Sequence, residues 1–581
     1  MTIASIYRLF REPFASACLC AVLWLLTATH GAAAPLVTRG PYLQKATPSA
    51  ITVRWRTDTP TTSRVLYGAA PGALAAFADD PDVTTEHSVR LRGLTAGTVY
   101  YYAVGSTTQT LAGGHAGYFF QTPPAPGTAV PTRIWVLGDA GTASAGQQAV
   151  RDAYLNFTGA KQTSLWLMLG DNAYQNGTDS EYQAAVFDLY PMTLRQSALW
   201  PALGNHDTAQ LSNPAPAIPY FDIFDLPVNG DAGGLASGTE SYYSFDYGNI
   251  HFVCLDSMTS SRAPDGPMLT WLQSDLANNT RQWLIAFWHH PPYTKGSHDS
   301  DAETQLTEMR ANALPLLESY GVDLVLTGHS HAYERSFLLD GHYGLSETLT
   351  LAMKKNGGDG RPAGNGAYVK PTGGPGPREG AVYVVAGSSG QTGGGALNHP
   401  AMFLSLNNLG SLVLDVNNNQ LDAKFIRENG VIADSFTMQK NPAGNGCQAI
   451  TLSPVQPTGG FQGQNYSQTF TASGPTGPFS FSVTGGVKPP GLTLAQDGTL
   501  SGMPTAPGVY SFTVTATNGV CAGSRALTMV ISGQGLMYSR CRGRCVCWIR
   551  ARGRRPAMRP ARPFLAPRPA RKPPPGEAAT A

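Results

Sequence analysis

The first folded region of the chain shows short segments in which apolar and polar residues alternate. Turn residues separate the clearest of these segments, which are residues 51–55, 63–67, 88–92 and 99–103. Such alternation is the pattern of a strand with one buried face, and strands at these intervals are typical of β-sandwiches. We therefore predict a β-sandwich that ends before the proline-rich linker from Pro123 to Gly127.

The second region changes to short runs that are apolar on both faces. These runs are Ile134–Leu137, Leu165–Leu169, Trp283–Phe287 and Val322–Leu326. Strands of this kind are buried on both sides, so we predict a sheet with helices on each side. Residues 147–157 and 304–320 are the clearest helical candidates, and the glycine-rich stretch 356–380 is predicted to be a long surface loop.

The third region, residues 447–533, returns to the β pattern. Turn pairs such as Asp497-Gly498 and Pro507-Gly508 separate its segments, which predicts a second β-sandwich. Cys447 and Cys521 bracket this region and could close it as a disulfide, although a sequence alone does not establish connectivity.

The two ends of the chain differ from the rest in composition. Arg8 and Arg11 precede an apolar run and then a stretch of small residues, which predicts a signal peptide over residues 1–34; a membrane anchor is the weaker alternative. Residues 534–581 are rich in Arg and Pro and are predicted to be disordered. This tail is either the product of a frame shift at the end of the gene or a basic segment that binds a surface.

Charge and export narrow the classes of function. Eleven arginines and Lys572 lie between Arg540 and the C-terminus, so the remainder of the chain is acidic. No specific nucleic-acid partner is therefore expected. A signal peptide predicts a secreted, periplasmic or cell-surface protein, and no later segment is long and apolar enough to span a membrane. Cys254 lies in an apolar strand and is predicted to be a buried thiol.

Five polar clusters follow the apolar strands of the second region. They are Gly138–Gly141, Gly170–Tyr174, Gly204–Asp207, His289–Tyr293 and Gly328–His331. Ligands of such sheets bind where the strands end, so the clusters are predicted to converge. Their Asp, Asn, His and Tyr side chains suit Zn, Fe or Mn better than Ca. The glycines before Asp139, Asp171, Asn205 and His329 are expected to let the backbone turn sharply.

Together the clusters resemble the metallophosphoesterase superfamily and, within it, the purple acid phosphatases. The specific features are Tyr174, three residues after Asp171, and the run Gly328-His-Ser-His-Ala-Tyr-Glu-Arg335. Arg39–Gln44 and Thr52–Trp55 also resemble the start of those phosphatases, and the resemblance extends from about residue 36 to 439. The segments Pro489–Thr493, Gly498–Pro504 and Tyr510–Thr515 resemble the Ig-like repeats of bacterial surface proteins.

The resemblance implies a multidomain fold. We expect a fibronectin-type β-sandwich over residues 35–123, an α/β metallophosphoesterase core of two sheets flanked by helices over residues 130–440, and an Ig-like β-sandwich over residues 447–533. The metallophosphoesterase region is expected to contain the catalytic site, because all five polar clusters lie in it.

The resemblance also implies the roles of individual residues. Asp139, Tyr174 and His331 would bind one metal, Asn205, His289 and His329 the other, and Asp171 would bridge both. His289 is chosen over His290 because the family's ligand precedes a one-residue spacer and a proline. The tyrosine site would hold Fe(III), and its partner Fe, Zn or Mn. His206 and His298 match the family's catalytic histidines on the substrate side, while Asp207, Glu334 and Arg335 would orient ligands or form ordinary salt bridges.

The expected function is that of a secreted acid phosphatase, which hydrolyses phosphate monoesters through a hydroxide held by two metals. Two alternatives stay open. The same site could act on phosphodiesters, such as nucleotides or phospholipid headgroups, or the chain could be an adhesive or scaffold protein with a vestigial phosphatase domain. The expected partners are a small phosphate ester and, for the Ig-like region, a cell surface or glycan.

Overall fold

The computed structural model describes residues 34–212, 218–441, 450–474, 478–518 and 522–533. The predicted signal peptide, the basic tail, Cys447 and Cys521 lie outside these residues. Cys254 is fully buried and free, as predicted. Among the described residues, no helix has the length and apolar character that crossing a membrane requires.

The N-terminal region is built from six strands joined in one hydrogen-bonded network. They are β1 (Val37–Thr47), β2 (Ala50–Gly68), β3 (Ala76–Arg92), β4 (Val99–Gly105), β5 (Thr110–Gly113) and β6 (Phe119–Gln121). Inward-facing residues of these strands, such as Trp55, Leu91 and Tyr102, form one core. The strands predicted at residues 51–55 and 63–67 are a single strand, β2. Irregular pairing with β3 between Arg56 and Ser63 lets this strand bend without a turn.

The central region contains two seven-stranded sheets. The first has the order β17-β22-β21-β20-β7-β8-β9 and the second β10-β11-β12-β13-β18-β14-β19. The strands of the first sheet are β7 (Thr132–Leu137), β8 (Leu165–Met168), β9 (Ala198–Pro201), β17 (Tyr368–Lys370), β20 (Gly410–Asn417), β21 (Gln420–Arg427) and β22 (Ile432–Lys440). Those of the second are β10 (Tyr243–Tyr247), β11 (Ile250–Cys254), β12 (Trp283–Phe287), β13 (Leu324–Thr327), β14 (Tyr333–Ser336), β18 (Val382–Ala386) and β19 (Met402–Leu406).

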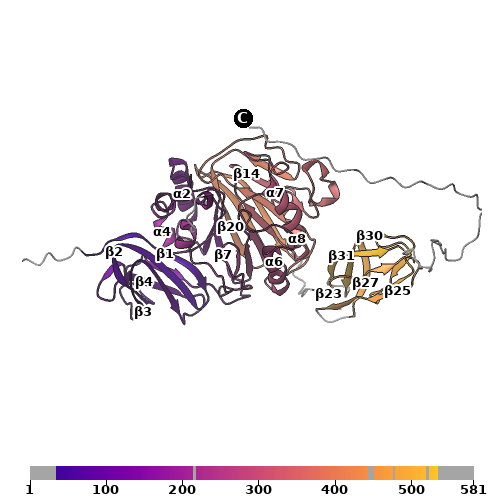
Figure 1. The fold of residues 1–581 in the computed structure, drawn as a ribbon, viewed down its shortest axis with the longest axis horizontal. Coiled ribbons are helices and arrows are strands. Elements are labelled where there is room, and N and C mark those ends of the chain that lie inside the picture. Colours follow the sequence, from indigo (N-terminus) through magenta and orange to yellow (C-terminus); the bar gives the residue numbers. More distant parts are fainter. Residues whose placement is uncertain (1–33, 213–217, 442–449, 475–477, 519–521, 534–581) are drawn as a thin grey trace, which may run out of the picture.

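The two sheets face each other and helices cover their outer sides (Figure 1). The inner core combines residues of both sheets, among them Val136, Leu326 and Leu412. On the first sheet, α2 (Ala145–Thr158) stacks Tyr154 on Trp135 with 4.0 Å between the ring centroids. A second core joins the other sheet to α6 (Pro267–Asn278) and the helical segment 304–319. Because helices cover both outer faces, the strands are apolar on both sides.

The parallel strands of each sheet bring the polar clusters to one rim. In the first sheet β7, β8 and β9 run parallel, and in the second β11, β12, β13 and β18 do so. All five clusters follow the ends of β7, β8, β9, β12 and β13. Loops at the carboxyl ends of parallel strands lie at the same edge of a sheet, so this topology gathers residues from 139 to 331.

Two details of the central region differ from the predictions. The helix predicted at residues 304–320 is a continuous helical segment with a π-helical turn, formed by α7 (Thr304–Glu308), η3 (Met309–Ala313) and α8 (Leu314–Ser319). The glycine-rich stretch 356–380 is not only a surface loop. It contributes the edge strand β17, whose Tyr368 and Lys370 are fully buried.

The shorter elements of the central region connect these sheets. They are α3 (Asp179–Tyr182), η1 (Gln183–Phe187), α4 (Pro191–Leu194), η2 (Ala209–Ser212), α5 (Pro219–Ile223), β15 (Leu338–Leu339), η4 (Ser346–Thr348), η5 (Leu351–Met353) and β16 (Lys354–Asn356).

The C-terminal region has its own core, which contains Phe470, Leu500, Phe512, Val514 and Met529. Its sheets have the orders β24-β31-β30-β27, β25-β29-β28 and β23-β26. The strands are β23 (Thr451–Ser453), β24 (Gly460–Phe461), β25 (Tyr466–Thr469), β26 (Thr471–Ser473), β27 (Ser480–Gly486), β28 (Leu492–Leu494), β29 (Thr499–Gly502), β30 (Gly508–Thr517) and β31 (Ala522–Ser532).

Candidate metal centre

Three of the predicted ligands have a left-handed backbone. The φ angles are 55° at Asp139, 54° at Asp171 and 66° at His329, and none of these residues is a glycine. Residues with side chains rarely adopt this conformation, and when they do they concentrate at functional sites. The sharp turns after β7, β8 and β13 therefore depend on the ligands themselves.

The glycines before the ligands have a different role from the one expected. Of Gly138, Gly170, Gly204 and Gly328, only Gly170 has a positive φ, of 93°. All four instead allow close approach. A Cβ atom on Gly204 would lie 2.2 Å from the backbone nitrogen of Asp171, and one on Gly328 would lie 2.4 Å from Asp139 Oδ2. The turns can touch because these positions carry no side chain.

The first donor set lies where the loops after β7, β8 and β13 meet. Tyr174 Oη is 3.1 Å from Asp139 Oδ1, 3.0 Å from Asp171 Oδ2 and 3.3 Å from His331 Nε2. Asp139 Oδ1 and His331 Nε2 are 3.6 Å apart. The structure thus brings together the three residues predicted for the tyrosine-bearing metal, with Asp171 beside them.

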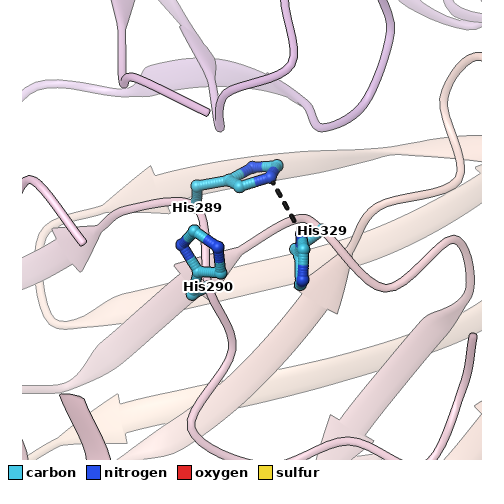
Figure 2. A group of neighbouring side chains, drawn as sticks. All are labelled: His289, His290 and His329. Atoms are coloured by element: carbon cyan, nitrogen blue, oxygen red, sulfur yellow. Dashed lines mark hydrogen bonds between the residues drawn. The ribbon is translucent and has the colours of Figure 1, made fainter. Parts of the chain in front are cut away.

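The second donor set is formed by Asn205, His289 and His329. Asn205 Oδ1 is 2.9 Å from His289 Nε2 and 3.0 Å from His329 Nδ1, and these two nitrogens are 3.2 Å apart. Figure 2 shows His289 and His329 with their facing ring nitrogens joined by this contact. The Nδ1–H of His289 donates to the carbonyl of Leu169 over 2.9 Å, which leaves Nε2 free to bind a cation.

One oxygen atom belongs to both donor sets. Asp171 Oδ2 lies 3.0 Å from Tyr174 Oη in the first set and 3.5 Å from His289 Nε2 in the second. The other oxygen, Oδ1, accepts a hydrogen bond of 2.8 Å from the backbone N–H of His206, which fixes the orientation of the carboxylate. Asp171 is therefore placed as a bridge between two adjacent sites.

The geometry and the chemistry of the donors fit two metal ions. With metal–ligand bonds of about 2.1 Å, neighbouring ligand atoms lie about 3.0–3.4 Å apart, and the observed separations are close to this range. Burial, together with the charges of Asp139 and Asp171, raises the pKa of Tyr174 well above its ordinary value. The phenol would ionise here only beside a cation, because two carboxylates already surround it.

His290 lies next to the second donor set, and one of its ring nitrogens lies within 4.8 Å of ligand nitrogens of His289 and His329. Its Nδ1 is 2.9 Å from Ser257 Oγ, and the same hydroxyl accepts a 3.1 Å hydrogen bond from the backbone N–H of His290. In Figure 2 its ring lies apart from the contact between His289 and His329. This arrangement favours His289 as the ligand.

The two predicted catalytic histidines lie at the exposed side of the cluster. The Nδ1–H of His206 donates to the carbonyl of Gln175 over 2.7 Å, and its Nε2 lies 3.9 Å from Asp171 Oδ2. His298 is on the other side, with its ring 3.7 Å from that of His329. The side chains of His206 and His298 are 28% and 31% exposed, so both are open to solvent beside the donor sets.

Glu303 is a residue of the site that the sequence analysis did not identify. Its carboxylate accepts hydrogen bonds from His298 Nδ1 over 2.8 Å and from His329 Nε2 over 3.1 Å. The hydrogen bond from His329 is the main reason why the pKa of Glu303 is lowered to about 2. Its position, five residues after His298 at the start of a helical segment, was the only available signal.

The three residues proposed as orienters have other contacts. Asp207 accepts hydrogen bonds from the backbone N–H groups of Asn172 and Gly204, over 3.0 and 2.8 Å, and so holds two ligand-bearing turns together. Glu334 accepts from Ser405 over 3.0 Å, and Arg335 forms a buried ion pair with Asp434. Arg335 is therefore an ordinary salt-bridge residue.

Three protein families match successive parts of the chain. Residues 41–122 match "Purple acid Phosphatase, N-terminal domain", residues 132–333 match "Calcineurin-like phosphoesterase", and residues 449–532 match "Putative Ig domain".

Similar proteins support the same assignment. Purple acid phosphatase 15 of Arabidopsis thaliana is 31% identical over 276 residues, which is 43% of this chain and 49% of that protein. A purple acid phosphatase of Glycine max is 28% identical over 52% of this chain and 64% of its own length. The chain thus spans about half to two thirds of these relatives.

A solved structure agrees on the fold. The purple acid phosphatase PPD1 from yellow lupin (Lupinus luteus) seeds superposes with a TM-score of 0.51 at 19% identity, covering 71% of this chain and 75% of that one. The predicted resemblance and fold class are confirmed. The chain is built from a purple acid phosphatase N-terminal domain, a calcineurin-like phosphoesterase domain and an Ig-like domain, in that order.

Proposed function

We propose that this protein is a dinuclear metal-dependent phosphatase that hydrolyses phosphate monoesters. The observation that carries the proposal is the position of Asp171 Oδ2, which lies 3.0 Å from Tyr174 Oη and 3.5 Å from His289 Nε2. A single carboxylate oxygen between two sets of O and N donors is the arrangement that holds two cations side by side. The similarity to purple acid phosphatases supports the same activity.

The residues of the site suit an anionic substrate. When bound, two metals bind phosphoryl oxygens and lower the pKa of water, which supplies the nucleophile for hydrolysis. Asp139, Asp171 and an ionised Tyr174 would provide the anionic ligands, while Asn205 and the histidines are neutral. The cations would therefore leave the site positively charged, which favours phosphate.

His206 is placed to assist the leaving group. Because its Nδ1–H is held by the carbonyl of Gln175, its Nε2 is directed toward the open side of the cluster. A protonated Nε2 can donate to an alkoxide that leaves from the substrate. His298 lies on the opposite side, where its Nε2, when the ring is protonated, can donate a hydrogen bond to a phosphoryl oxygen.

Metal analysis combined with two substrates tests the proposal. The purified protein is expected to contain two metal ions and to hydrolyse 4-nitrophenyl phosphate faster than bis(4-nitrophenyl) phosphate. Asp171→Asn should abolish hydrolysis, because it weakens the one ligand shared by both metals. Asp152→Asn is the matched control, since Asp152 lies on α2 with a side chain that is 56% exposed.

Each other outcome contradicts a part of the proposal. Full activity with one metal or none would refute the dinuclear site. A faster reaction with the diester would show that the protein is a phosphodiesterase and not a phosphomonoesterase. No hydrolysis of either ester by protein with two bound metals would favour a vestigial domain.

We propose further that the protein is exported and that its Ig-like domain contacts a cell surface or glycan. Export is supported by the charged, apolar and small-residue segments within residues 1–34. Sequencing the N-terminus of the protein secreted by an expressing cell tests it. A mature chain that still begins at Met1 would contradict export through a cleaved signal.

A further inference from the structure

Glu303 lies between a predicted metal ligand and a predicted substrate-side histidine. It is the residue immediately before α7 (Thr304–Glu308), and its backbone carbonyl accepts a 3.0 Å hydrogen bond from the N–H of Thr307. The start of the helix therefore fixes its backbone. Its side chain is 33% exposed and reaches into the cluster, where each carboxylate oxygen faces a different imidazole.

The first imidazole is that of His329, whose two nitrogens have separate partners. Nδ1 faces Asn205 Oδ1 at 3.0 Å and His289 Nε2 at 3.2 Å, which is the direction of the second donor set. Nε2 faces Glu303 Oε2 at 3.1 Å. Because a carboxylate can only accept, Nε2 carries the proton and Nδ1 keeps its lone pair for a cation.

The second imidazole is that of His298, and the same reasoning applies. Its Nδ1–H donates to Glu303 Oε1 over 2.8 Å, so its Nε2 is left free. The two rings lie close together, with 3.7 Å between centroids and 33° between planes. One carboxylate thus determines the tautomer and the orientation of both rings.

We propose that Glu303 is a positioning residue that orients His329 toward the second metal and His298 toward the substrate. This inference rests on the proposed function, because it assumes that Asn205, His289 and His329 bind a cation. A carboxylate that accepts from the outer nitrogen of a ligating histidine raises its basicity and fixes its orientation. Loss of such a partner typically lowers metal affinity by about 10–100-fold.

A competing arrangement uses the same residues. The ligand atoms of His298, Glu303 and His329 lie within 4.8 Å of one another, so these residues could hold a metal of their own. In that case Glu303 would be a ligand and the protein would bind a third ion. The orientation of His329 Nδ1 toward Asn205 and His289 favours the positioning role.

Metal titration of the full chain tests the inference. Metal-free protein would be titrated in competition with a chromophoric chelator, with metal counted by elemental analysis. Glu303→Gln should weaken the second equivalent of metal by about 10–100-fold and leave the first unchanged. Glu308→Gln is the control, because this residue ends the helix that begins directly after Glu303 and pairs with Arg262 over 2.8 Å.

Two further variants separate positioning from a purely structural effect. His298→Ala removes one partner of the carboxylate and leaves the other, so both metal affinities should stay within about threefold of the wild type while KM rises. Glu303→Asp keeps the charge but is one methylene shorter, so it should recover part of the lost affinity. Thermal unfolding of each metal-free variant shows whether the fold is intact.

The possible failures are distinguishable. Wild-type protein that binds fewer than two metals would overturn the proposed function, and this inference with it. Wild-type protein with two metals and a Glu303→Gln variant of equal affinity would overturn the inference alone. A third equivalent of metal, lost in Glu303→Gln, would show that Glu303 is a direct ligand.

Discussion

The substitution Gly204→Ala tests whether the site depends on direct contact between two ligand-bearing turns. Gly204 precedes the predicted ligand Asn205 and has no positive φ, so its backbone conformation accepts alanine. The new methyl group would lie 2.2 Å from the backbone nitrogen of Asp171 and 2.3 Å from its Oδ1. The effect of the substitution is therefore steric, and it acts on the bridging residue.

The magnitude follows from the distance that the turns must move. An ordinary carbon contact requires about 3.4 Å, so the two turns must separate by about 1 Å. Neither turn can move easily, because the carboxylate of Asp207 accepts hydrogen bonds from the backbone N–H groups of both Gly204 and Asn172. Misplacement by about 1 Å can lower a rate by about 10²-fold. Overpacking in a buried site typically costs about 1–3 kcal/mol of stability.

The assay compares three quantities in the wild type and the variant. They are kcat/KM for 4-nitrophenyl phosphate, the number of bound metals, and the free energy of unfolding in urea. Gly357→Ala is the matched control, since no atom lies within 4 Å of the position that its new methyl group would take and its φ is not positive. A Gly204→Ala variant with two metals and kcat/KM within about threefold of the wild type would refute the reasoning.

Three other predictions concern single side chains. If Fe(III) binds beside Tyr174, the protein should absorb visible light, and Tyr174→Phe should remove the band; a variant that keeps both iron and colour would contradict ligation. His206→Ala should slow alkyl phosphates by about 10²–10⁴-fold and nitrophenyl phosphate less, because a poor leaving group needs the proton, so equal losses would exclude an acid role. Burial lowers the pKa of His251, but hydrogen bonds to Asp246 and Asp275 outweigh this effect and raise the pKa to about 9. The charged form therefore stabilises the fold below about pH 6.5, and about 3 kcal/mol should be lost as the pH rises through 9. Urea unfolding at pH 6 and 10 should show this loss in the wild type but not in His251→Gln, and equal losses would contradict it.

Much of the fold could be predicted from the sequence because it depends on local patterns. Alternation of apolar and polar residues identified strands of the N-terminal and C-terminal regions. Runs that are apolar on both faces identified β7, β8, β12 and β13 of the central region. Patterns failed where a local signal competed with tertiary contacts. The turn expected between residues 57 and 62 does not form, because β2 runs through them as one strand whose pairing with β3 shifts register between Arg56 and Ser63. Tyr368 and Lys370 lie in a glycine-rich stretch but are buried by a long-range contact with β22.

By itself the sequence determined which side chains could serve as ligands and that each follows a strand. The identities of Asp139, Asp171, Tyr174, Asn205 and the histidines need no structure, because donor chemistry belongs to the residue type. Only the tertiary structure decided how these donors meet. It brought one oxygen of Asp171 within reach of both donor sets, and it directed the two nitrogens of His329 to different partners.

The physical reason is that these relations form between distant parts of the chain. Left-handed turns at Asp139, Asp171 and His329 aim the ligands, and the packing of glycine against a neighbouring turn sets their separation. Neither is encoded in any single segment. Glu303 shows this most clearly, since its residue type and neighbours resemble an ordinary helix start, and its place beside His298 and His329 arises only when the sheets assemble.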